Sequence, residues 1–479
     1  MQRIKLVFFS CLLMMLGVSV NAQDTTVYSK LSLKQSIDIA LKNNIPVKQT
    51  GLQVERAQVD RNQAKANLLP SFNANFNYGF NTGRTIDPIT NSYINQQLQS
   101  SGVGITGGVL LFNGFQLQNF IKQTGYALDA SKMDYQQAKD NLTLNVVLAY
   151  LLVLNNHDQL DIARNQAEVT SKQVERMGVL VKEGAVGQYQ LSDLKGNYAG
   201  DQINIVNAQN NLAQSRLNFC QLLNIPYNPD LELESEFTLP AEKYPLTPAE
   251  VYNLGIQNLP MVKAADYRVK SSDKLIKAIR GDFYPSIFAQ GNFSSSYSNA
   301  ATTAIPGAIL ETTTGDYVKI AGLESPVFTK QQQFSSEKIG YFTQLDNNRG
   351  SFYGLFMQIP IFNNFTVRNR VKTAKINLKD AELTAANTRV TLRQNVEQAW
   401  QNMSSAFDRY KVLLDQVSNY EESFRAAEIR FNAGAINSTD YLIVKNALDR
   451  AKENLAQAKY EFIIRNRVLD YYQGKPIAE

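Results

Sequence analysis

Few residues of this chain are of the types that usually carry catalysis or hold a metal. His157 is the sole histidine, and it lies in a polar stretch, NNHDQ, where a surface position is expected. The cysteines are Cys11 and Cys220, and Cys220 lies in a helical pattern, where a free thiol usually fills a small core position. One histidine and one cysteine downstream of residue 22 cannot supply an ordinary zinc site. The eight methionines form no cluster, so we expect no metal site.

The chain also lacks a G-x-S-x-G elbow, a Walker sequence and a histidine-based triad. Residues 102–107, GVGITG, match the dinucleotide-binding pattern letter by letter. That pattern needs a strand before it and a helix directly after it. Here a polar loop precedes the segment and a strand-like alternation follows, so small residues on a strand explain the glycines better. We therefore expect no cofactor and no enzymatic activity.

Two glycine-containing segments are each expected to form the turn of a helical hairpin. Gly184 and Gly434 are predicted to end the first helix of each hairpin in a left-handed conformation. Asn437 is predicted to cap the next helix, with Asp440 three residues on in the manner of a capping box. A cap does not exclude a second role, because the end of a long hairpin is also where a partner would dock. The candidate residues are Arg176, Gly184, Ala185, Gln190, Arg430, Gly434, Ala435, Asn437 and Asp440.

Both hairpin turns belong to an internal duplication. Residues 69–71 (LPS) recur as residues 284–286 (YPS), 215 positions later, and residues 112–115 (FNGF) recur as residues 362–365 (FNNF), 250 positions later. Tyr150 and Trp400 also lie 250 residues apart, and both are expected to be packing anchors. The loops 82–101 and 296–350 have 20 and 55 residues, which accounts for the whole change of offset. The two copies should therefore fold alike.

The N-terminus has the pattern of a secretory signal peptide. Arg3 and Lys5 precede an apolar stretch, and Val20-Asn21-Ala22 resembles a cleavage site. The formal net charge is +5, of which these two basic residues supply two, so the mature chain is close to neutral and we expect no nucleic-acid partner. No later apolar run approaches the ~18 residues that a transmembrane helix needs.

Four segments predict strands of membrane-spanning length. Along residues 72–81 the alternate positions are apolar on one face and mostly asparagine on the other. Segments 102–112, 285–297 and 351–362 repeat this alternation, although Phe352 and Phe356 interrupt it in the last one. About ten residues is the length with which a tilted strand crosses a bilayer. A soluble sandwich is the alternative, but no other segment predicts a sheet for these strands to pack on.

The remaining sequence is helical, with coiled-coil-like spacing of small apolar residues. Seventy helical residues would extend ~105 Å, more than three times the thickness of a hydrocarbon core. The predicted organisation is a signal peptide (1–22), a first repeat (23–223; strands 71–81 and 102–112, helical hairpin 113–222), a linker (224–245), a second repeat (246–473; strands 285–297 and 351–362, helical hairpin 363–472) and a tail (474–479). The fold class is thus mixed: mainly long α-helical hairpins with four strands.

Signal peptide, duplication, strand pairs, long helices and the second turn, FNAGAINSTDYL at 431–442, together resemble the TolC family of outer-membrane efflux proteins. The resemblance implies a homotrimer in the outer membrane of a Gram-negative cell. Its strands would form a twelve-stranded barrel in the lipid, and its helices would form an α-helical barrel in the periplasm. It implies a passive exit duct of a tripartite efflux or type I secretion system. A periplasmic adaptor (membrane fusion) protein would couple it to an inner-membrane RND or ABC transporter.

The resemblance also assigns roles to the hairpin turns. Asp440, Asn437 and Gln190 would line the periplasmic constriction, whereas Arg176, Gly184, Ala185, Arg430, Gly434 and Ala435 would contact the adaptor. The chain departs from the family pattern where Gln190 and Ile443 replace frequent acidic residues. Loop 296–350 is expected to be long, polar and outside the cell. The alternatives are a secreted coiled-coil interaction protein without a membrane barrel, and an envelope enzyme, for which no convergent polar cluster is visible.

Overall fold

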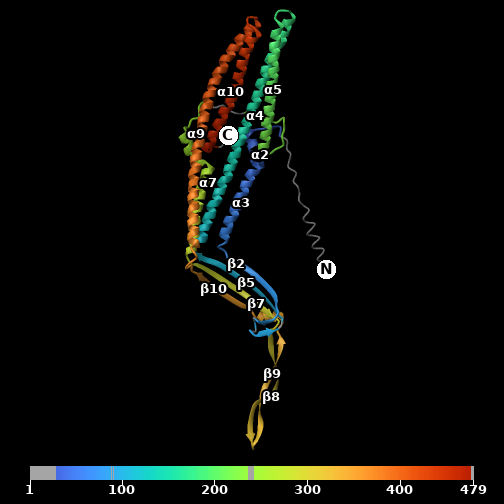
Figure 1. Ribbon diagram of the computed structural model, residues 1–479, viewed down its shortest axis with the longest axis vertical. Helices are drawn as coiled ribbons and strands as arrows, with labels where there is room; N and C mark the ends of the chain where they lie inside the picture. Colours follow the sequence, from blue (N-terminus) through green and yellow to red (C-terminus); the bar gives the residue numbers. More distant parts are fainter. Residues whose placement is uncertain (1–27, 88, 90, 96, 236–241, 476–479) are drawn as a thin grey trace, which may run out of the picture. The chain divides into compact units, whose positions relative to one another are not determined.

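The computed structural model describes residues 28–475 except positions 88, 90, 96 and 236–241 (Figure 1). The predicted signal peptide, residues 1–22, lies outside the described residues. The chain forms two compact units. Unit 1 comprises Met1–Arg56, Leu128–Arg268 and Ala381–Glu479, and unit 2 comprises Ala57–Ala127 and Val269–Asp380. Each unit therefore takes segments from both sequence repeats.

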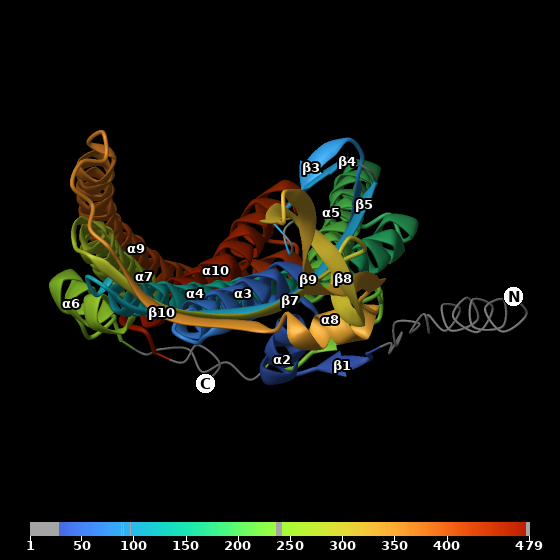
Figure 2. The same ribbon diagram turned by 90° about the horizontal axis from the view of Figure 1, so that it is seen from below.

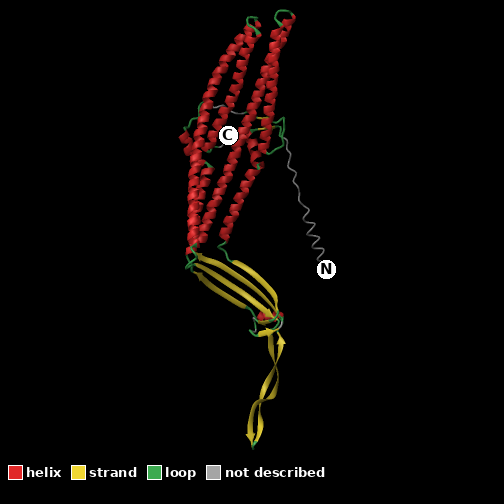
Figure 3. Cartoon of the chain, viewed as in Figure 1, coloured by secondary structure: helices red, strands yellow, loops and turns green. Residues whose placement is uncertain are grey.

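Helices make up most of the described chain (Figure 3), and they repeat in matching lengths. The long helices α4 and α9 have 67 residues each, and the return helices α5 and α10 have 36 each. Each boundary of α4 and α5 recurs 250 residues later in α9 and α10, the offset found in the sequence. No helix in the described part of the chain is long and apolar enough to be a membrane span. The helices are α2 (Leu33–Asn43), α3 (Ile45–Ala66), α4 (Gln116–Lys182), α5 (Gln188–Leu223), α6 (Pro248–Asn258), α7 (Pro260–Arg280), α8 (Tyr341–Asn347), α9 (Thr366–Asn432) and α10 (Ser438–Gln473).

The first helix of each repeat starts with the same local structure. Ser32 caps α2 and Thr247 caps α6, and in each case the side chain three residues on, Gln35 or Glu250, returns a hydrogen bond to the cap backbone. These capping boxes satisfy backbone N–H groups that a helix start leaves without partners. The two caps are 215 residues apart, which is the offset of the first part of the duplication.

Unit 2 contains an antiparallel four-stranded sheet in the order β10-β7-β5-β2. Its register separates an apolar from an amide-rich face: Ile105 opposes Phe293, whereas the next residue, Thr106, opposes Asn73 and Asn292. Among the described residues, β2 and β10 pair on one side only and form the two edges. The strands are β2 (Ser71–Asn81), β5 (Leu98–Asn113), β7 (Ser286–Ser298) and β10 (Gly350–Gln358).

Two strand boundaries differ from the expected ones. β5 begins at Leu98 instead of residue 102, because residues 98–101 continue the pairing with β2. β10 ends at Gln358 instead of residue 362, and Pro360, which has no N–H to give to a ladder, follows closely.

Segment 296–350 is not the polar loop that the sequence analysis expects. Beyond the end of β7 it forms a ribbon of β8 (Thr302–Ile320) and β9 (Leu323–Lys338), and then α8. Ala321 and Gly322 connect the two strands with φ of 52° and 84°, which suits a two-residue hairpin turn. The other loop, 82–101, contains a smaller hairpin, β3 (Arg84–Ile86) and β4 (Tyr93–Asn95). Helix α8 lies against β7 (Figure 2), where the Ser295 hydroxyl donates to the Leu345 carbonyl over 2.7 Å.

The turns from strand to long helix are also duplicated. Gly114 and Phe115 have φ of 63° and 61°, and Asn364 and Phe365 have φ of 52° and 59°. In each copy two phenylalanine rings meet edge to face at 5.5 Å. Gly114 is required for a second reason, because a Cβ there would lie 2.6 Å from the Gly281 carbonyl oxygen.

The core of unit 1 contains the expected packing anchors. The Tyr150 side chain is fully buried, with its hydroxyl 3.1 Å from the Leu31 carbonyl oxygen. The Trp400 indole donates to the Leu246 carbonyl over 3.0 Å, and Leu31 and Leu246 are themselves 215 residues apart. Short strands β1 (Lys30–Leu31) and β6 (Glu232–Leu233) pair beside Tyr150. Both aromatic residues therefore anchor a helix to the start of their own repeat.

The isolated histidine and cysteine occupy the places that the sequence predicts. The Cys220 side chain is buried in the core of unit 1, and this burial raises the pKa of its thiol. The His157 side chain is half exposed, with Nδ1 3.4 Å from an Asp161 carboxylate oxygen. Neither residue lies near the hairpin turns.

Candidate functional site at the helical hairpin ends

The turns of the two hairpins have the same backbone structure. Gly184 and Gly434 adopt φ of 71° and 73°, the predicted left-handed conformation. In the first turn the N–H of Ala185 donates to the Leu180 carbonyl over 2.9 Å, and in the second the N–H of Ala435 donates to the Arg430 carbonyl over 2.8 Å. These glycines and alanines are exposed, and so are Arg176 and Arg430. The glycines are needed for the turn, and the surface around them is free within this chain.

The return helices start differently in the two copies. The Asn437 side chain accepts a hydrogen bond from the Asp440 N–H over 2.8 Å, so the predicted cap of α10 is present. Gly187 occupies the equivalent position before α5 and offers no side-chain acceptor. The Asp440 carboxylate is exposed, and at the position of Asp440 in the first copy the Gln190 amide donates to the Tyr189 hydroxyl over 3.2 Å. The copies therefore differ by one exposed negative charge.

A small apolar cluster joins the ends of the two hairpins within the chain. Its members come from all four long helices: Met177, Leu191, Leu194, Phe431 and Tyr441. The rings of Phe431 and Tyr441 stack at a centroid distance of 4.5 Å. Polar contacts add to it, since the Arg176 guanidinium donates to the Asn432 carbonyl over 2.8 Å and the Ser438 hydroxyl donates to the Asp193 carboxylate over 3.1 Å. The predicted tip residues are thus brought together by a shared core.

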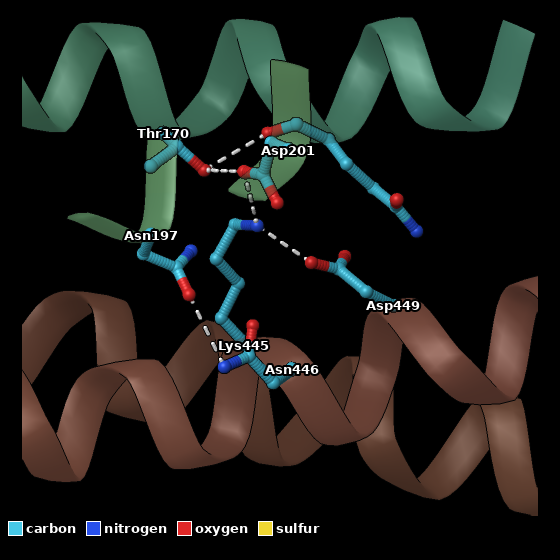
Figure 4. Close-up of polar contacts among 7 residues, drawn as sticks. Thr170, Asn197, Asp201, Lys445, Asn446 and Asp449 are labelled. Carbon is cyan, nitrogen blue, oxygen red and sulfur yellow. Dashed lines mark hydrogen bonds and ion pairs between the residues drawn. The ribbon is translucent and has the colours of Figure 1, made fainter. Parts of the chain in front are cut away.

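A buried ionic cluster lies farther along the return helices (Figure 4). The Lys445 ammonium group on α10 donates to Asp201 on α5 over 3.1 Å and to Asp449 on α10 over 2.6 Å. Thr170 on α4 donates its hydroxyl to the same Asp201 carboxylate over 2.5 Å. The Lys445 side chain is 2% exposed and that of Asp201 is 9% exposed. Three helices of both hairpins are therefore tied together at one lysine.

The cluster carries more negative than positive charge. Asp449, and Glu453 one turn later on α10, face a single buried lysine together with Asp201. Burial is the main reason why the pKa of Asp449 and of Glu453 is raised, and the Lys445 charge partly opposes this at both positions. Leaving one buried carboxylate without its cation would be costly, so Lys445 has a role that a surface lysine would not have.

Reasoning from the sequence did not identify this cluster. The available signal was the spacing of Tyr441, Lys445 and Leu448, which step by four and three residues along the buried side of α10. A lysine at such a position predicts a buried acidic partner. Its identity, Asp201, is 244 residues away and could not be read from one sequence.

Comparison with known proteins identifies the family. The family model of outer membrane efflux proteins matches residues 36–224 and 251–474, which include both strand pairs and both hairpins. The chain belongs to the outer membrane efflux protein family. The predicted family is thus confirmed, and with it an outer-membrane location and a role in efflux. The alternative of a secreted coiled-coil protein is not supported, because the match includes the strand segments.

Individual members of the outer membrane efflux protein family match over most of their length. Outer membrane protein TolC of Escherichia coli is 21% identical over 406 residues, which cover 84% of this chain and 74% of TolC. The CmeC outer membrane channel of Campylobacter jejuni superposes with a TM-score of 0.72 at 16% identity, over 92% of this chain and 85% of CmeC. The open-state MtrE channel of Neisseria gonorrhoeae gives 0.70 at 18% identity, over 92% and 88%. At these identities the structural comparisons show the fold alone.

Proposed function

We propose that this chain is one subunit of a homotrimeric outer-membrane exit duct for efflux or type I secretion. The observation that carries the proposal is the sheet with two free edges, β2 and β10. Successive neighbours in the sheet are antiparallel, so these two edges run in opposite directions. β2 of one copy can therefore form an antiparallel pair with β10 of the next, and three copies close a twelve-stranded barrel. An open edge in lipid would leave backbone groups without hydrogen bonds, so closure is a physical requirement.

The two faces of the sheet support a membrane position. The apolar face exposes large side chains, with Phe72 75% and Tyr353 81% exposed within the single chain. Such a surface is costly in water and suits hydrocarbon. The opposite face, with Asn73, Thr106 and Asn292, suits a water-filled lumen.

The helical hairpins would continue the duct into the periplasm and gate it at their ends. Asp440, Asn437 and Gln190 are the proposed constriction residues, and the Asp440 carboxylate is free to face a pore because it is exposed. Arg176, Gly184, Ala185, Arg430, Gly434 and Ala435 are the proposed contacts for a periplasmic adaptor protein. An inner-membrane RND or ABC transporter would supply the energy, since no residue of this chain has a visible catalytic arrangement.

Fractionation and gel mobility test the proposal as a whole. A membrane barrel should be found in the outer-membrane fraction and should change its gel mobility on heating, whereas a secreted coiled-coil rod would be soluble after lysis. Recovery of the full chain in the soluble fraction, with no heat-dependent mobility, would refute the duct.

Single-channel recording tests the constriction. We expect Asp440→Asn to weaken block of the closed pore by added multivalent cations, because it removes a charge from the proposed ring. Asp415→Asn removes an equally exposed charge from the middle of α9 and is the matched control. Equal block in both variants would remove Asp440 from the constriction. For the adaptor surface, cysteines at positions 185 and 435 should form crosslinks to an adaptor, and their failure to do so would count against docking there.

A further inference from the structure

The amide-rich face of the sheet is not uniformly polar. Phe288 on β7 and Phe356 on β10 are directly opposite each other on this face, and their side chains are 37% and 45% exposed. Phe352 lies on the same face, with its ring centroid 5.9 Å from that of Phe356. These are the residues that interrupt the alternation of the sequence. Exposed aromatic rings on a water-facing strand surface need an explanation other than lipid contact.

The first two rings line a groove of about 730 Å³ in unit 2, where the sheet meets the ends of α3 and α4. Leu110 and Leu117 continue the apolar floor. Polar amides lie along it, including those of Asn73 and Gln290. The residues that line the groove include no Asp, Glu, Lys or Arg.

We propose that this groove binds uncharged, aromatic amphiphilic molecules as they pass through the duct. The inference rests on the proposed function, in which the amide-rich face lines the lumen. The volume is within the range of sites for drug-sized molecules, and an apolar floor with a few convergent amides is typical of such sites. A charged molecule would lose hydration without gaining a counter-ion, so the lining selects neutral ligands. The rings of Phe288 and Phe356 provide stacking partners for an aromatic group.

Gly108 offers a second way to test the groove without removing the rings. It lies among the lining residues, opposite Gln290. A Cβ at this position would meet its nearest neighbour, the Ala289 carbonyl oxygen, at 3.5 Å, which is ordinary contact. Gly108→Leu should therefore fill the groove with little change to the sheet.

The test uses single-channel recording of the purified full chain with two neutral probes, chloramphenicol, which is aromatic, and sucrose, which is not. In the unmodified chain we expect chloramphenicol to block the current with longer dwell times than sucrose. Phe356→Ala should shorten the chloramphenicol dwell about fivefold, the loss expected for one aromatic pair, and Gly108→Leu should shorten it as well. Phe72→Ala removes an aromatic ring from the opposite face and should leave the dwell unchanged.

The outcomes separate the groove from the duct. Channels that conduct normally but hold both probes equally briefly overturn the groove and leave the duct standing. Chains that insert into the bilayer without conducting overturn both. If Phe288→Ala or Phe356→Ala abolishes the heat-sensitive oligomer on gels, a second copy of the chain covers these rings, and that result also overturns ligand binding.

Discussion

Replacing Lys445 by methionine tests whether one buried lysine holds the two hairpins together. Methionine keeps an unbranched side chain of similar length but has no charge. Asp201 and Asp449 would then lack the cation that lies 3.1 Å and 2.6 Å from them. Removing one partner of a buried ion pair typically costs ~3–5 kcal/mol. The Asp449 side chain is 18% exposed, so water can replace part of the lost contact, and we expect a value near the lower end of that range.

Hydrogen exchange of the amides around residues 197–205 and 441–452 is the appropriate assay, because it reports local opening of these helices. A loss of ~3 kcal/mol in local stability corresponds to exchange about 100-fold faster. Lys172→Met is the matched control. Lys172 pairs with Glu168 at 2.7 Å on the same hairpin, but both side chains are more than half exposed, and such pairs contribute at most ~1 kcal/mol.

The triple change Lys445→Met, Asp201→Asn and Asp449→Asn removes every charge of the contact. Since replacing a whole buried ionic group is often nearly neutral, we expect the triple variant to recover protection to within ~1 kcal/mol of the original chain. Exchange in Lys445→Met that is no faster than in Lys172→Met would refute the reasoning, and so would a triple variant no better protected than Lys445→Met.

Three further predictions concern the same unit. Gly434→Ala should destabilise the second turn by ~1–2 kcal/mol, because an alanine is strained at φ of 73°; Gly178→Ala, inside α4, should instead stabilise by up to ~1 kcal/mol, and protease sensitivity of the hairpin would compare them. Tyr441→Phe should leave thermal stability unchanged or raise it, because the Tyr441 hydroxyl is buried without a hydrogen-bond partner among the described residues; a large loss would indicate a hidden partner. Lowering the pH from 7 to 5 should increase exchange protection around the cluster, after correction for intrinsic rates. The folded-state pKa of Asp449 and of Glu453 is raised, so the folded state binds more protons than the unfolded state in this window; decreasing protection would contradict this sign.

Much of the fold could be predicted because local patterns determine it. The matched positions in the duplication gave α4 and α9 the same length, and the alternation at residues 72–81 gave the two faces of β2. The glycines of the turns were recognisable because a left-handed cap favours one residue type. In each case the deciding interactions lie within a few residues of one another along the chain.

The features that were not predicted depend on distant partners or on mixed composition. Lys445 could be placed on the buried side of α10, but its partner Asp201 belongs to the other hairpin. The ribbon of β8 and β9 contains threonine, isoleucine, glutamine and lysine without a strict alternation, so its sequence resembles a polar loop. Phe356 was noticed only as an interruption, because its neighbour Phe288 lies on another strand.

The most direct measurement of the central claim is disulfide crosslinking between the free edges of the sheet in intact outer membranes. A cysteine at position 76 on β2 is combined in turn with cysteines at 351, 353, 355 and 357 on β10, which lie on the same apolar face. A chain with only its native cysteines is the control. The account predicts that at least one pair links copies into a ladder that ends at three subunits, and only between different copies. Absence of any such ladder from correctly inserted chains, or a ladder that ends at another number, would contradict the closed trimeric barrel.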